Sequence, residues 1–319
     1  MSSRHELEYF LGAIRFFTRL PVPRWVGHSS EALERSMRYF PAVGLIVGFI
    51  GALVFAVTSF FWPKTLAVLA SMAATLYATG AFHEDGWGDM VDGFGGGWSK
   101  ERILAIMKDS RIGSYGAVAL IMVLLTKFCA LVEIDLLLIP VTLIAGHGFS
   151  RLCAALLMSQ LDYVRDEEGK AKPLATRIGG GELIFATITA LLPLLLLAPK
   201  QSIPAVVLAL LATLWLGRMF KKQIGGYTGD CLGATQQLAE VAGSALRHPA
   251  GIDEHQRGVV GEHLIQHVPL DHRPYGSARP IPRGAGDRRG QGTGRSGSGR
   301  PGRPADSCPR GRRRWLRGR

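Results

Sequence analysis

The stretch AVGLIVGFIGALVFAVTSFFW, residues 42–62, is followed after Pro63 and Lys64 by a second uncharged stretch, TLAVLASMAATLYATGAF, residues 65–82. A helix rises about 1.5 Å per residue, so roughly 20 apolar residues are needed to cross a hydrocarbon core of about 30 Å. Both stretches are close to that length, and only the Pro-Lys pair separates them. They therefore predict two membrane-spanning helices that are joined by a tight turn.

Further apolar stretches extend this pattern along the chain. They cover residues 114–132, 136–158, 183–199 and 202–217. Residues 232–245 form another apolar stretch, which is too short to cross a bilayer alone. Only helices and closed barrels can satisfy the backbone hydrogen bonds within lipid. The predicted fold is therefore an all-α, polytopic integral membrane bundle of about six transmembrane helices, with an incomplete seventh.

The charged residues between these stretches are unevenly distributed. The segments before residue 42 and within 83–113, 159–182 and 218–231 together hold 17 Lys and Arg residues, whereas the turns on the opposite side hold only Lys64 and Lys200. Cytoplasmic loops of membrane proteins carry the excess of Lys and Arg. We therefore expect the N-terminus and all the long loops to lie in the cytoplasm.

The first 23 residues, MSSRHELEYFLGAIRFFTRLPVP, do not have the uninterrupted apolar core of a cleavable signal peptide. Their apolar residues recur at helical spacing, from Leu7 and Phe10 to Ile14 and Phe17. This pattern predicts an amphipathic helix that lies at the membrane surface or packs against the bundle.

The formal net charge of +12 comes mainly from the C-terminal segment. Residues 243–319 contain 16 Arg, no Lys and 6 acidic residues, which leaves 21 basic and 19 acidic residues before them. A segment so rich in Arg, Gly and Pro is typical of disorder, and also of an out-of-frame reading of GC-rich DNA. We expect a membrane-embedded domain at 1–242 and a disordered tail at 243–319 that is a candidate frameshift product. Because the excess charge is confined to the tail, the composition does not indicate nucleic-acid binding.

The four cysteines are widely spaced and form no CxxC pair. They are Cys129, Cys153, Cys231 and Cys308. This distribution argues against a disulfide framework and against a zinc site.

The segment GAFHEDGWGDMVDGFGGG, residues 80–97, places Asp85, Asp89 and Asp92 at positions i, i+4 and i+7. On a helix these carboxylates share one face, where they repel one another unless a cation compensates. Carboxylate oxygens suit Mg²⁺, which often completes its coordination with substrate phosphates. The motif therefore predicts a Mg²⁺ site and phosphoryl chemistry. The alternative is a solvated acidic helix face, for which the many glycines would be poor choices.

Two neighbouring features add polar groups to this loop. His83 could accept a proton or support the metal site from its outer side. The segment MKDSRIGSYG, residues 107–116, offers Lys108, Ser110 and Arg111 as phosphate ligands and Asp109 as a further carboxylate. Capping of the third span is the structural alternative for that segment.

Charged residues also occur within or beside the later spans. The segment GGYTGDCLGA, residues 225–234, brings Asp230 and the neighbouring Gly229 to the end of the sixth span, and Arg151 lies inside the fourth. A charge in such a place is costly without a partner, so we expect Asp230 and Arg151 to face the interior of the bundle and to contribute to the site. Lys127 is expected to extend to the membrane surface or to pair with Glu133.

Taken together, five stretches resemble the cobalamin synthase family, the adenosylcobinamide-GDP ribazoletransferases of bacteria. They are FFTRLPVP (16–23), YFPAVGLIVG (39–48), GAFHEDGWGDMVDGFGGG (80–97), MKDSRIGSYG (107–116) and GGYTGDCLGA (225–234). The resemblance covers residues 7–242 in order, spacing and expected membrane topology. The family continues with a further apolar helix to a nearby C-terminus, whereas the pattern here stops near residue 242.

The resemblance implies transfer of the adenosylcobinamide-phosphate group from adenosylcobinamide-GDP to α-ribazole or its 5′-phosphate, with release of GMP and with Mg²⁺ as cofactor. It places the protein in the bacterial inner membrane, in contact with the lipid bilayer, with its active site facing the cytoplasm. Self-association, or association with other enzymes of cobalamin biosynthesis, would fit this setting. Asp85, Asp89 and Asp92 would hold the metal, and Arg111 with Lys108 would stabilise the transferred phosphoryl group. Asp109, Asp230 and His83 are unranked candidates for the proton acceptor.

Three other functions are alternatives to the ribazoletransferase activity that the resemblance implies. A membrane CDP-alcohol phosphotransferase also binds metal through several aspartates, but here Asp85 and Gly86 are followed by Trp-Gly-Asp-Met, which departs from the DG-x₂-AR arrangement of those enzymes. A transporter would place its charged groups at the bilayer midplane, whereas these motifs gather at one face. A non-catalytic scaffold would not need the three aspartates.

Overall fold

The structure, a computed structural model, describes residues 3–27, 29–165 and 178–245. The residues beyond 245, which make up nearly all of the predicted tail and include Cys308, lie outside the described part. Within those ranges the named elements are helical, and the strand-like pairing is a single bridge between Tyr163 and Tyr227. The all-α fold class is therefore confirmed.

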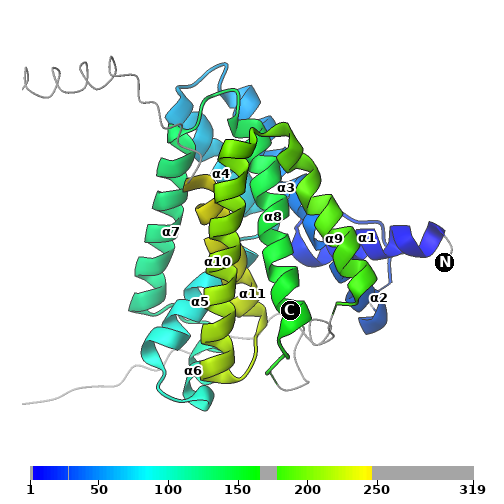
Figure 1. The fold of residues 1–319 in the computed structure, drawn as a ribbon, viewed down its shortest axis with the longest axis vertical. Helices are drawn as coiled ribbons and strands as arrows, with labels where there is room; N and C mark the ends of the chain where they lie inside the picture. The colour runs from blue at the N-terminus through cyan, green and yellow to red at the C-terminus, as the bar shows by residue number, and fades with distance from the viewer. Residues whose placement is uncertain (1–2, 28, 166–177, 246–319) are drawn as a thin grey trace, which may run out of the picture. The chain divides into compact units, whose positions relative to one another are not determined.

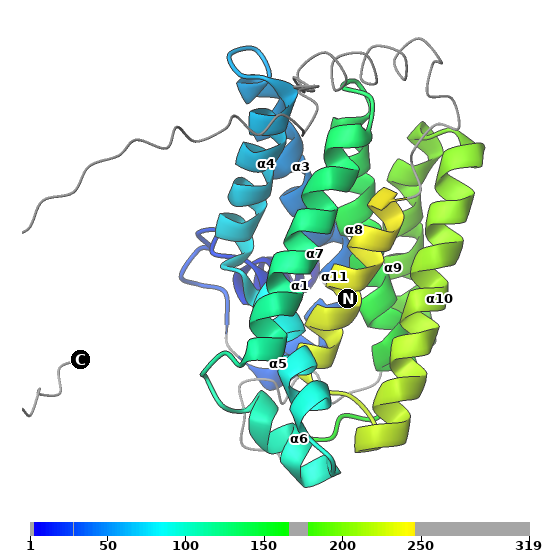
Figure 2. The same cartoon turned by 90° about the vertical axis from the view of Figure 1, so that its left-hand side faces the viewer.

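Four helices of the described residues are long and apolar enough to cross a membrane. The first, Ala32–Thr58, covers most of α2 (Ser30–Ser36) and all of η1 (Met37–Tyr39) and α3 (Phe40–Thr58). The others are α7 (Ser114–Glu133), α8 (Ile139–Gln160) and α10 (Pro199–Ile224). Figures 1 and 2 show α3, α7, α8 and α10 running alongside one another. The chain is thus a multi-pass membrane protein.

The second predicted span differs from the expected straight helix. It forms α4 (Lys64–Thr79), which follows α3 after the predicted short turn, and then α5 (Phe82–Gly96), and these two helices meet at an angle of 86°. The backbone explains the bend, because Gly80 ends α4 with a φ of 69° and Ala81 follows with a φ of 57°. Counted as one span, α4 and α5 bring the number of spans to five.

The segment at 183–199, which was predicted as a span, is shorter than the helices of membrane length in the described residues. It forms α9 (Gly180–Leu191) and a 3₁₀ turn, η3 (Leu192–Leu196). Pro193 stands at the start of η3 and lacks the N–H that a continuing helix requires. The helix is therefore interrupted before it reaches the length of a span.

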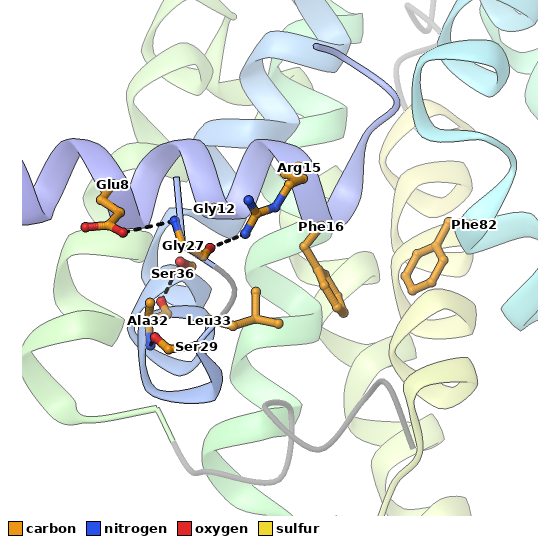
Figure 3. Close-up of a pocket in the computed structure, with 10 residues that line it drawn as sticks. All are labelled: Glu8, Gly12, Arg15, Phe16, Gly27, Ser29, Ala32, Leu33, Ser36 and Phe82. Carbon is orange, nitrogen blue, oxygen red and sulfur yellow. Dashed lines mark hydrogen bonds between the residues drawn. The ribbon is translucent and has the colours of Figure 1, made fainter. Parts of the chain in front are cut away.

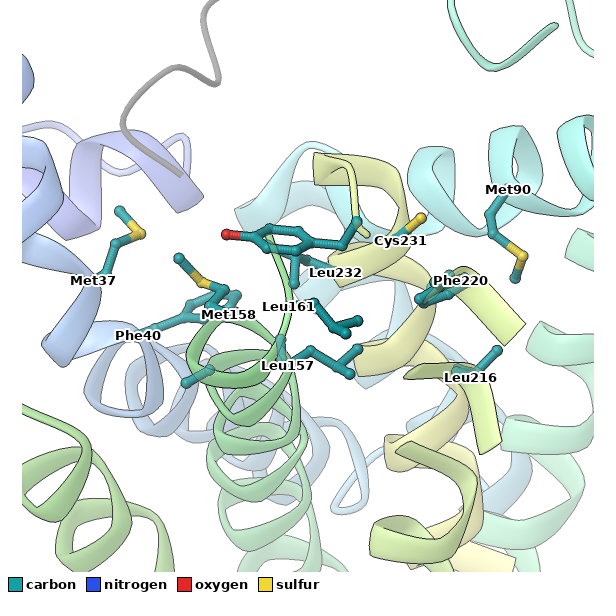
Figure 4. Packing of buried hydrophobic residues seen from close by; sticks show 14 of the residues in the cluster. Met37, Phe40, Met90, Leu157, Met158, Leu161, Leu216, Phe220, Cys231 and Leu232 are labelled. Carbon is teal, nitrogen blue, oxygen red and sulfur yellow. The ribbon is translucent and has the colours of Figure 1, made fainter. Parts of the chain in front are cut away.

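The N-terminal helix packs against the bundle, which was one of the two arrangements expected for it. It is α1 (Ser3–Phe17), and its last residue stacks on Phe40 of α3 with ring centroids 4.1 Å apart. Ala13 and Phe17 belong to a buried apolar cluster that also draws on α3, α8, α10 and α11 (Figure 4). Arg19, just past α1, lies against Gly80, so this segment also covers the bend between α4 and α5.

The last described helix, α11 (Gly229–Ala245), is buried along most of its length. It contacts α5, α7, α8 and α10, and residues 231–237 are all buried. This helix contains the segment at 232–245 that was predicted as an incomplete seventh span. With 17 residues it is short, but it lies inside the bundle rather than facing lipid.

Glycines allow α3 and α8 to pack in close contact. A Cβ on Gly44 would lie 2.3 Å from the carbonyl oxygen of His147, and a Cβ on Gly48 would lie 2.6 Å from Cα of Ile144. Small residues of this kind let membrane helices approach at the level of their backbones. The hairpin of α3 and α4 is thereby held against α8.

We expect the Gly48→Ala variant to unfold at a lower temperature than the wild type. The added methyl group meets backbone atoms of α8, which cannot move aside as a flexible side chain could, and such overpacking costs about 1–3 kcal/mol. Gly146→Ala is the matched control, because a Cβ on Gly146 has no atom within 4 Å. Thermal unfolding in detergent micelles would compare the variants, and equal midpoints would contradict this account of the α3–α8 contact.

Candidate active site

The three aspartates of the acidic motif lie on α5, as their spacing predicts. The helix begins after the bend at Gly80 and Ala81 and passes the N-terminal part of α7. There the indole N–H of Trp87 donates to the carbonyl oxygen of Ala119 at 3.1 Å. Asp85 is exposed and Asp89 is half-buried, whereas Asp92 is only 8% exposed. The three carboxylates therefore share a helix but do not share an environment.

Asp92 binds the N-terminus of α7. Its Oδ2 accepts from the backbone N–H of Gly113 at 2.7 Å, and its Oδ1 accepts from the N–H of Gly116 at 2.8 Å. A helix N-terminus has unpaired N–H groups and a partial positive charge, both of which favour a carboxylate. Both oxygens of Asp92 are therefore engaged in joining α5 to α7, which leaves Asp85 and Asp89 as the open carboxylates of the motif.

Asp230, in the first turn of α11, faces the open carboxylates of α5. Gly86 makes this approach close, because a Cβ there would lie 3.0 Å from Cα of Asp230. Gly233, one turn further along α11, lies in the same way against the backbone of His83. The carboxylates of Asp85, Asp89 and Asp230 are near enough to repel one another. Burial raises the pKa of Asp230, and the charge on Asp85 raises it further.

Arg165 supplies a positive charge beside this acidic cluster, by which we mean Asp85, Asp89 and Asp230. Its Nη2 donates to Oδ2 of Asp230 at 2.6 Å and to the carbonyl oxygen of Met107 at 3.1 Å. The bridge between Tyr163 and Tyr227 brings the segment after α8 beside the start of α11 and so positions Arg165. The guanidinium partly offsets the rise in the pKa of Asp230.

The donor set of this cluster suits Mg²⁺ bound in part by substrate. Within the described residues, no group of three or more His, Cys, Asp or Glu side chains lies close enough to surround one ion. Mg²⁺ commonly uses only one or two carboxylates and takes its remaining ligands from water and substrate phosphates. Asp85 and Asp89 fit that pattern, whereas Asp92 does not, because its oxygens are bound to α7.

The segment after α6 (Lys100–Met107) lines a separate pocket of about 610 Å³. Arg102, Asp109, Arg111 and Ser114 contribute its polar groups, and Asp92 lies at its wall. Arg111 is bound to Asp109 through Nε and Nη2, with a shortest distance of 2.7 Å. The same pairing lowers the pKa of Asp109, which makes it a weaker proton acceptor. Lys108 and Ser110 are exposed and are not among the residues that line this pocket.

The structure buries two further predicted site residues. His83 is 2% exposed and lies among the rings of Phe17, Phe40 and Phe82, with both ring nitrogens lacking a hydrogen-bond partner in the described residues. Arg151 is fully buried in α8, where Nη1 donates to the carbonyl oxygen of His147 at 2.9 Å. Neither His83 nor Arg151 is therefore open to solvent. The predicted site residue Gly229, by contrast, is the first residue of α11, next to Asp230.

The expectation that Lys127 extends to the membrane surface was wrong. Its side chain is buried within the bundle and forms an ion pair with Glu240 of α11. Glu240 also contacts Nε2 of His147 at 3.3 Å. A signal for this pair was present, since one basic and one acidic residue occur within apolar segments. The two residues are more than 100 positions apart, however, and nothing in the spacing indicates that they meet.

Another pocket lies between α1, α2 and the start of α5 (Figure 3). This pocket has a volume of about 410 Å³ and is mostly apolar, with Phe16, Leu33 and Phe82 among its lining residues. Glu8 and Arg15 bind the backbone at its rim, where Arg15 donates to the carbonyl oxygen of Val26 at 2.7 Å. None of the acidic-cluster residues lines it.

We expect Asp92→Ala to destabilise the protein by about 2 kcal/mol, because hydrogen bonds to a charged group contribute about 1.5–3 kcal/mol and two N–H groups would lose their acceptor. Asp109→Ala is the control, since it removes an exposed carboxylate from the same region and should change stability by less than about 0.5 kcal/mol. Thermal unfolding of both variants tests this difference. If Asp92→Ala were as stable as Asp109→Ala, the carboxylate would not be holding α7.

Comparison with known proteins agrees with these features. The sequence model of the cobalamin-5-phosphate synthase family matches residues 9–246. An adenosylcobinamide-GDP ribazoletransferase of Shewanella amazonensis is 46% identical over 243 residues, which cover 75% of this chain and 94% of the relative. The enzyme of the same name from Shewanella woodyi is 46% identical over 243 residues, 75% of this chain and 95% of the relative. That of Shewanella oneidensis is 46% identical over 244 residues, 74% and 92% of the two chains.

No solved structure matches the chain. The family match includes α1 to α11 almost completely, and with it every residue of the acidic cluster together with Arg165. The helical membrane bundle, the acidic helix at one end of it and the extent of the match lead to one conclusion: the chain belongs to the cobalamin-5-phosphate synthase family.

Proposed function

We propose that this chain, an adenosylcobinamide-GDP ribazoletransferase by family, carries out its reaction at the acidic cluster of α5 and α11. The observation that carries the proposal is the approach of Asp230 to Asp85 and Asp89, with Arg165 beside them. The substrates would be adenosylcobinamide-GDP and α-ribazole or its 5′-phosphate. The products would be adenosylcobalamin or its 5′-phosphate, together with GMP.

Asp85 and Asp89 would hold Mg²⁺, which would supply charge neutralisation for the pyrophosphate and for the departing GMP. These two carboxylates are the members of the motif that remain open, since Asp92 is bound to α7. Their mutual repulsion with Asp230 makes binding of a cation favourable. Arg111 and Lys108 remain candidates for contacts with the phosphates. Arg111 would first have to leave Asp109, to which it is bound at the protein surface.

Asp230 is the best placed of the three candidates for the proton acceptor. A hydroxyl group of α-ribazole would attack the phosphorus on the cobinamide side, the bond to the GMP oxygen would break, and the hydroxyl proton would pass to a carboxylate. His83 is buried among aromatic rings, and Asp109 is held by Arg111. Asp230 is also paired, with Arg165, but it faces the acidic helix, and burial raises its pKa, which favours proton uptake.

The distribution of positive charge supports a cytoplasmic position for this site. The acidic cluster lies on the connection between α4 and α7 and at the start of α11, and these are the segments in which Lys and Arg are concentrated. The excess of basic residues marks cytoplasmic loops. A site there would meet nucleotide substrates directly, and α3, α7, α8 and α10 would hold it at the inner membrane.

We expect Asp89→Ala to reduce Mg²⁺-dependent release of GMP by about 100-fold or more, because it removes a charge that holds the metal at the reacting phosphates. Membranes containing the chain would be given adenosylcobinamide-GDP and α-ribazole, and GMP would be quantified by chromatography. Glu101→Ala, which removes an exposed carboxylate from α6, should stay within about twofold of the wild type. Unchanged release from the Asp89 variant would refute this assignment of the site.

Arg165→Gln is expected to slow GMP release by about tenfold, which corresponds to about 1.4 kcal/mol of barrier. The variant leaves Asp230 without its neighbouring positive charge and so disturbs the charge balance of the cluster. Arg165→Lys keeps the charge and should recover part of the rate, whereas Arg218→Gln, at an exposed position on α10, should have little effect. Rates at saturating substrate would distinguish these variants, and equal losses in the Gln and Lys variants would argue against an electrostatic role.

A further inference from the structure

The central helix α11 carries polar side chains that are buried within the bundle. Gln237 and Glu240 lie on adjacent turns of this helix, and both are 3% exposed or less. Buried polar groups of this kind are costly unless they are paired. Their partners therefore restrict where α11 can lie.

The two side chains reach different helices. Gln237 donates from Nε2 to Oε1 of Glu84 on α5 at 2.8 Å. Glu240 pairs with Lys127 on α7 and contacts His147 on α8 at 3.3 Å. A shift of α11 by one residue, about 1.5 Å along its axis, would separate both sets of partners. Apolar contacts alone would tolerate such a shift far better, because they have no preferred direction.

Both contacts affect where the residues of the acidic cluster lie. Glu84 is the residue before Asp85, so the bond from Gln237 joins α11 to α5 immediately beside the proposed metal ligands. Asp230 lies on the same helix, ten residues before Glu240, which corresponds to about 15 Å along the axis. The position of Asp230 relative to Asp85 and Asp89 thus depends on the register of α11.

We propose that Gln237 and Glu240 are positioning residues for the transfer reaction, which hold α11 in the register that places Asp230 beside Asp85 and Asp89. Lys127 on α7 is the partner that fixes Glu240. The inference rests on the proposed use of the acidic cluster to bind a divalent cation. Gln237 and Glu240 would thus influence the acidic cluster from deep in the bundle, although they do not touch it.

The test uses the full chain in lipid nanodiscs and measures Mn²⁺ binding by electron paramagnetic resonance, alongside GMP release. Glu240→Gln and Gln237→Leu should each weaken Mn²⁺ binding by about tenfold or more and slow GMP release. Ser244→Ala is the matched control, because its hydroxyl group, as far as the described residues show, donates to the carbonyl oxygen of Glu240 within the same buried helix. It should bind Mn²⁺ as the wild type does.

A second variant separates positioning from charge balance. Glu240→Gln leaves the charge of Lys127 buried without its partner and could prevent folding, so Lys127→Met/Glu240→Met, which removes both charges, is measured as well. We expect this double variant to fold, as judged by size-exclusion chromatography and thermal unfolding, and still to bind Mn²⁺ about tenfold more weakly. Wild-type binding in the folded double variant would overturn the proposal, because the pair would then serve only to balance charge.

The wild type and Asp89→Asn show which of the two proposals has failed. If the wild type binds Mn²⁺ and Asp89→Asn does not, while the Gln237 and Glu240 variants bind normally, only the positioning role is overturned. If Asp89→Asn binds Mn²⁺ as well as the wild type does, the assignment of the acidic cluster fails and the positioning role fails with it.

Discussion

The close contact between α5 and α11 determines where the reactive groups of this protein lie. Gly86 and Gly233 have no side chains, so the two helices meet at the level of their backbones. This contact brings Asp230 to the open carboxylates of α5, although about 140 residues separate them in the sequence. The bridge between Tyr163 and Tyr227 then adds Arg165 from a third part of the chain. The site depends on this contact more than on any one side chain within it.

A polar group that the surrounding bundle encloses is costly unless it has a partner. Asp92 meets this requirement by binding two N–H groups at the start of α7, and Glu240 meets it by pairing with Lys127. Both carboxylates are buried, and both join one helix to another. In an apolar environment a lost partner costs several kcal/mol, so these contacts specify the arrangement of the helices more sharply than apolar packing does.

The sequence predicted what depends on local composition and missed what depends on contacts between distant segments. The helical bundle, the hairpin at Pro63 and the helix that carries the acidic motif followed from apolar length and from the spacing of the aspartates. The bend after α4 was missed because it results from left-handed backbone at Gly80 and at Ala81, and alanine gives no signal of that conformation. The interruption of α9 could have been read from Pro193, since proline rarely continues a helix.

The candidate site shows the same division. Spacing placed Asp85, Asp89 and Asp92 on one face of a helix, but it could not show that the start of α7 would take up both oxygens of Asp92. Arg165 was indistinguishable from the other basic residues of its loop, and Lys127 was assigned to the surface because its partner lies on a helix over 100 residues away. These residues acquire their roles only from the tertiary structure.

The composition of α5 explains why its neighbours matter so much. Glycines such as Gly86, Gly88 and Gly93 each disfavour a helix by about 1 kcal/mol relative to alanine, so this helix would not persist alone. It is held instead by Trp87 and Asp92 on α7 and by Gln237 on α11. The same glycines allow the close approach that brings Asp230 to the cluster. A helix with a higher intrinsic propensity would depend less on its neighbours, but its side chains would keep α11 at a distance. The acidic cluster can therefore form only because the helix propensity of α5 is low.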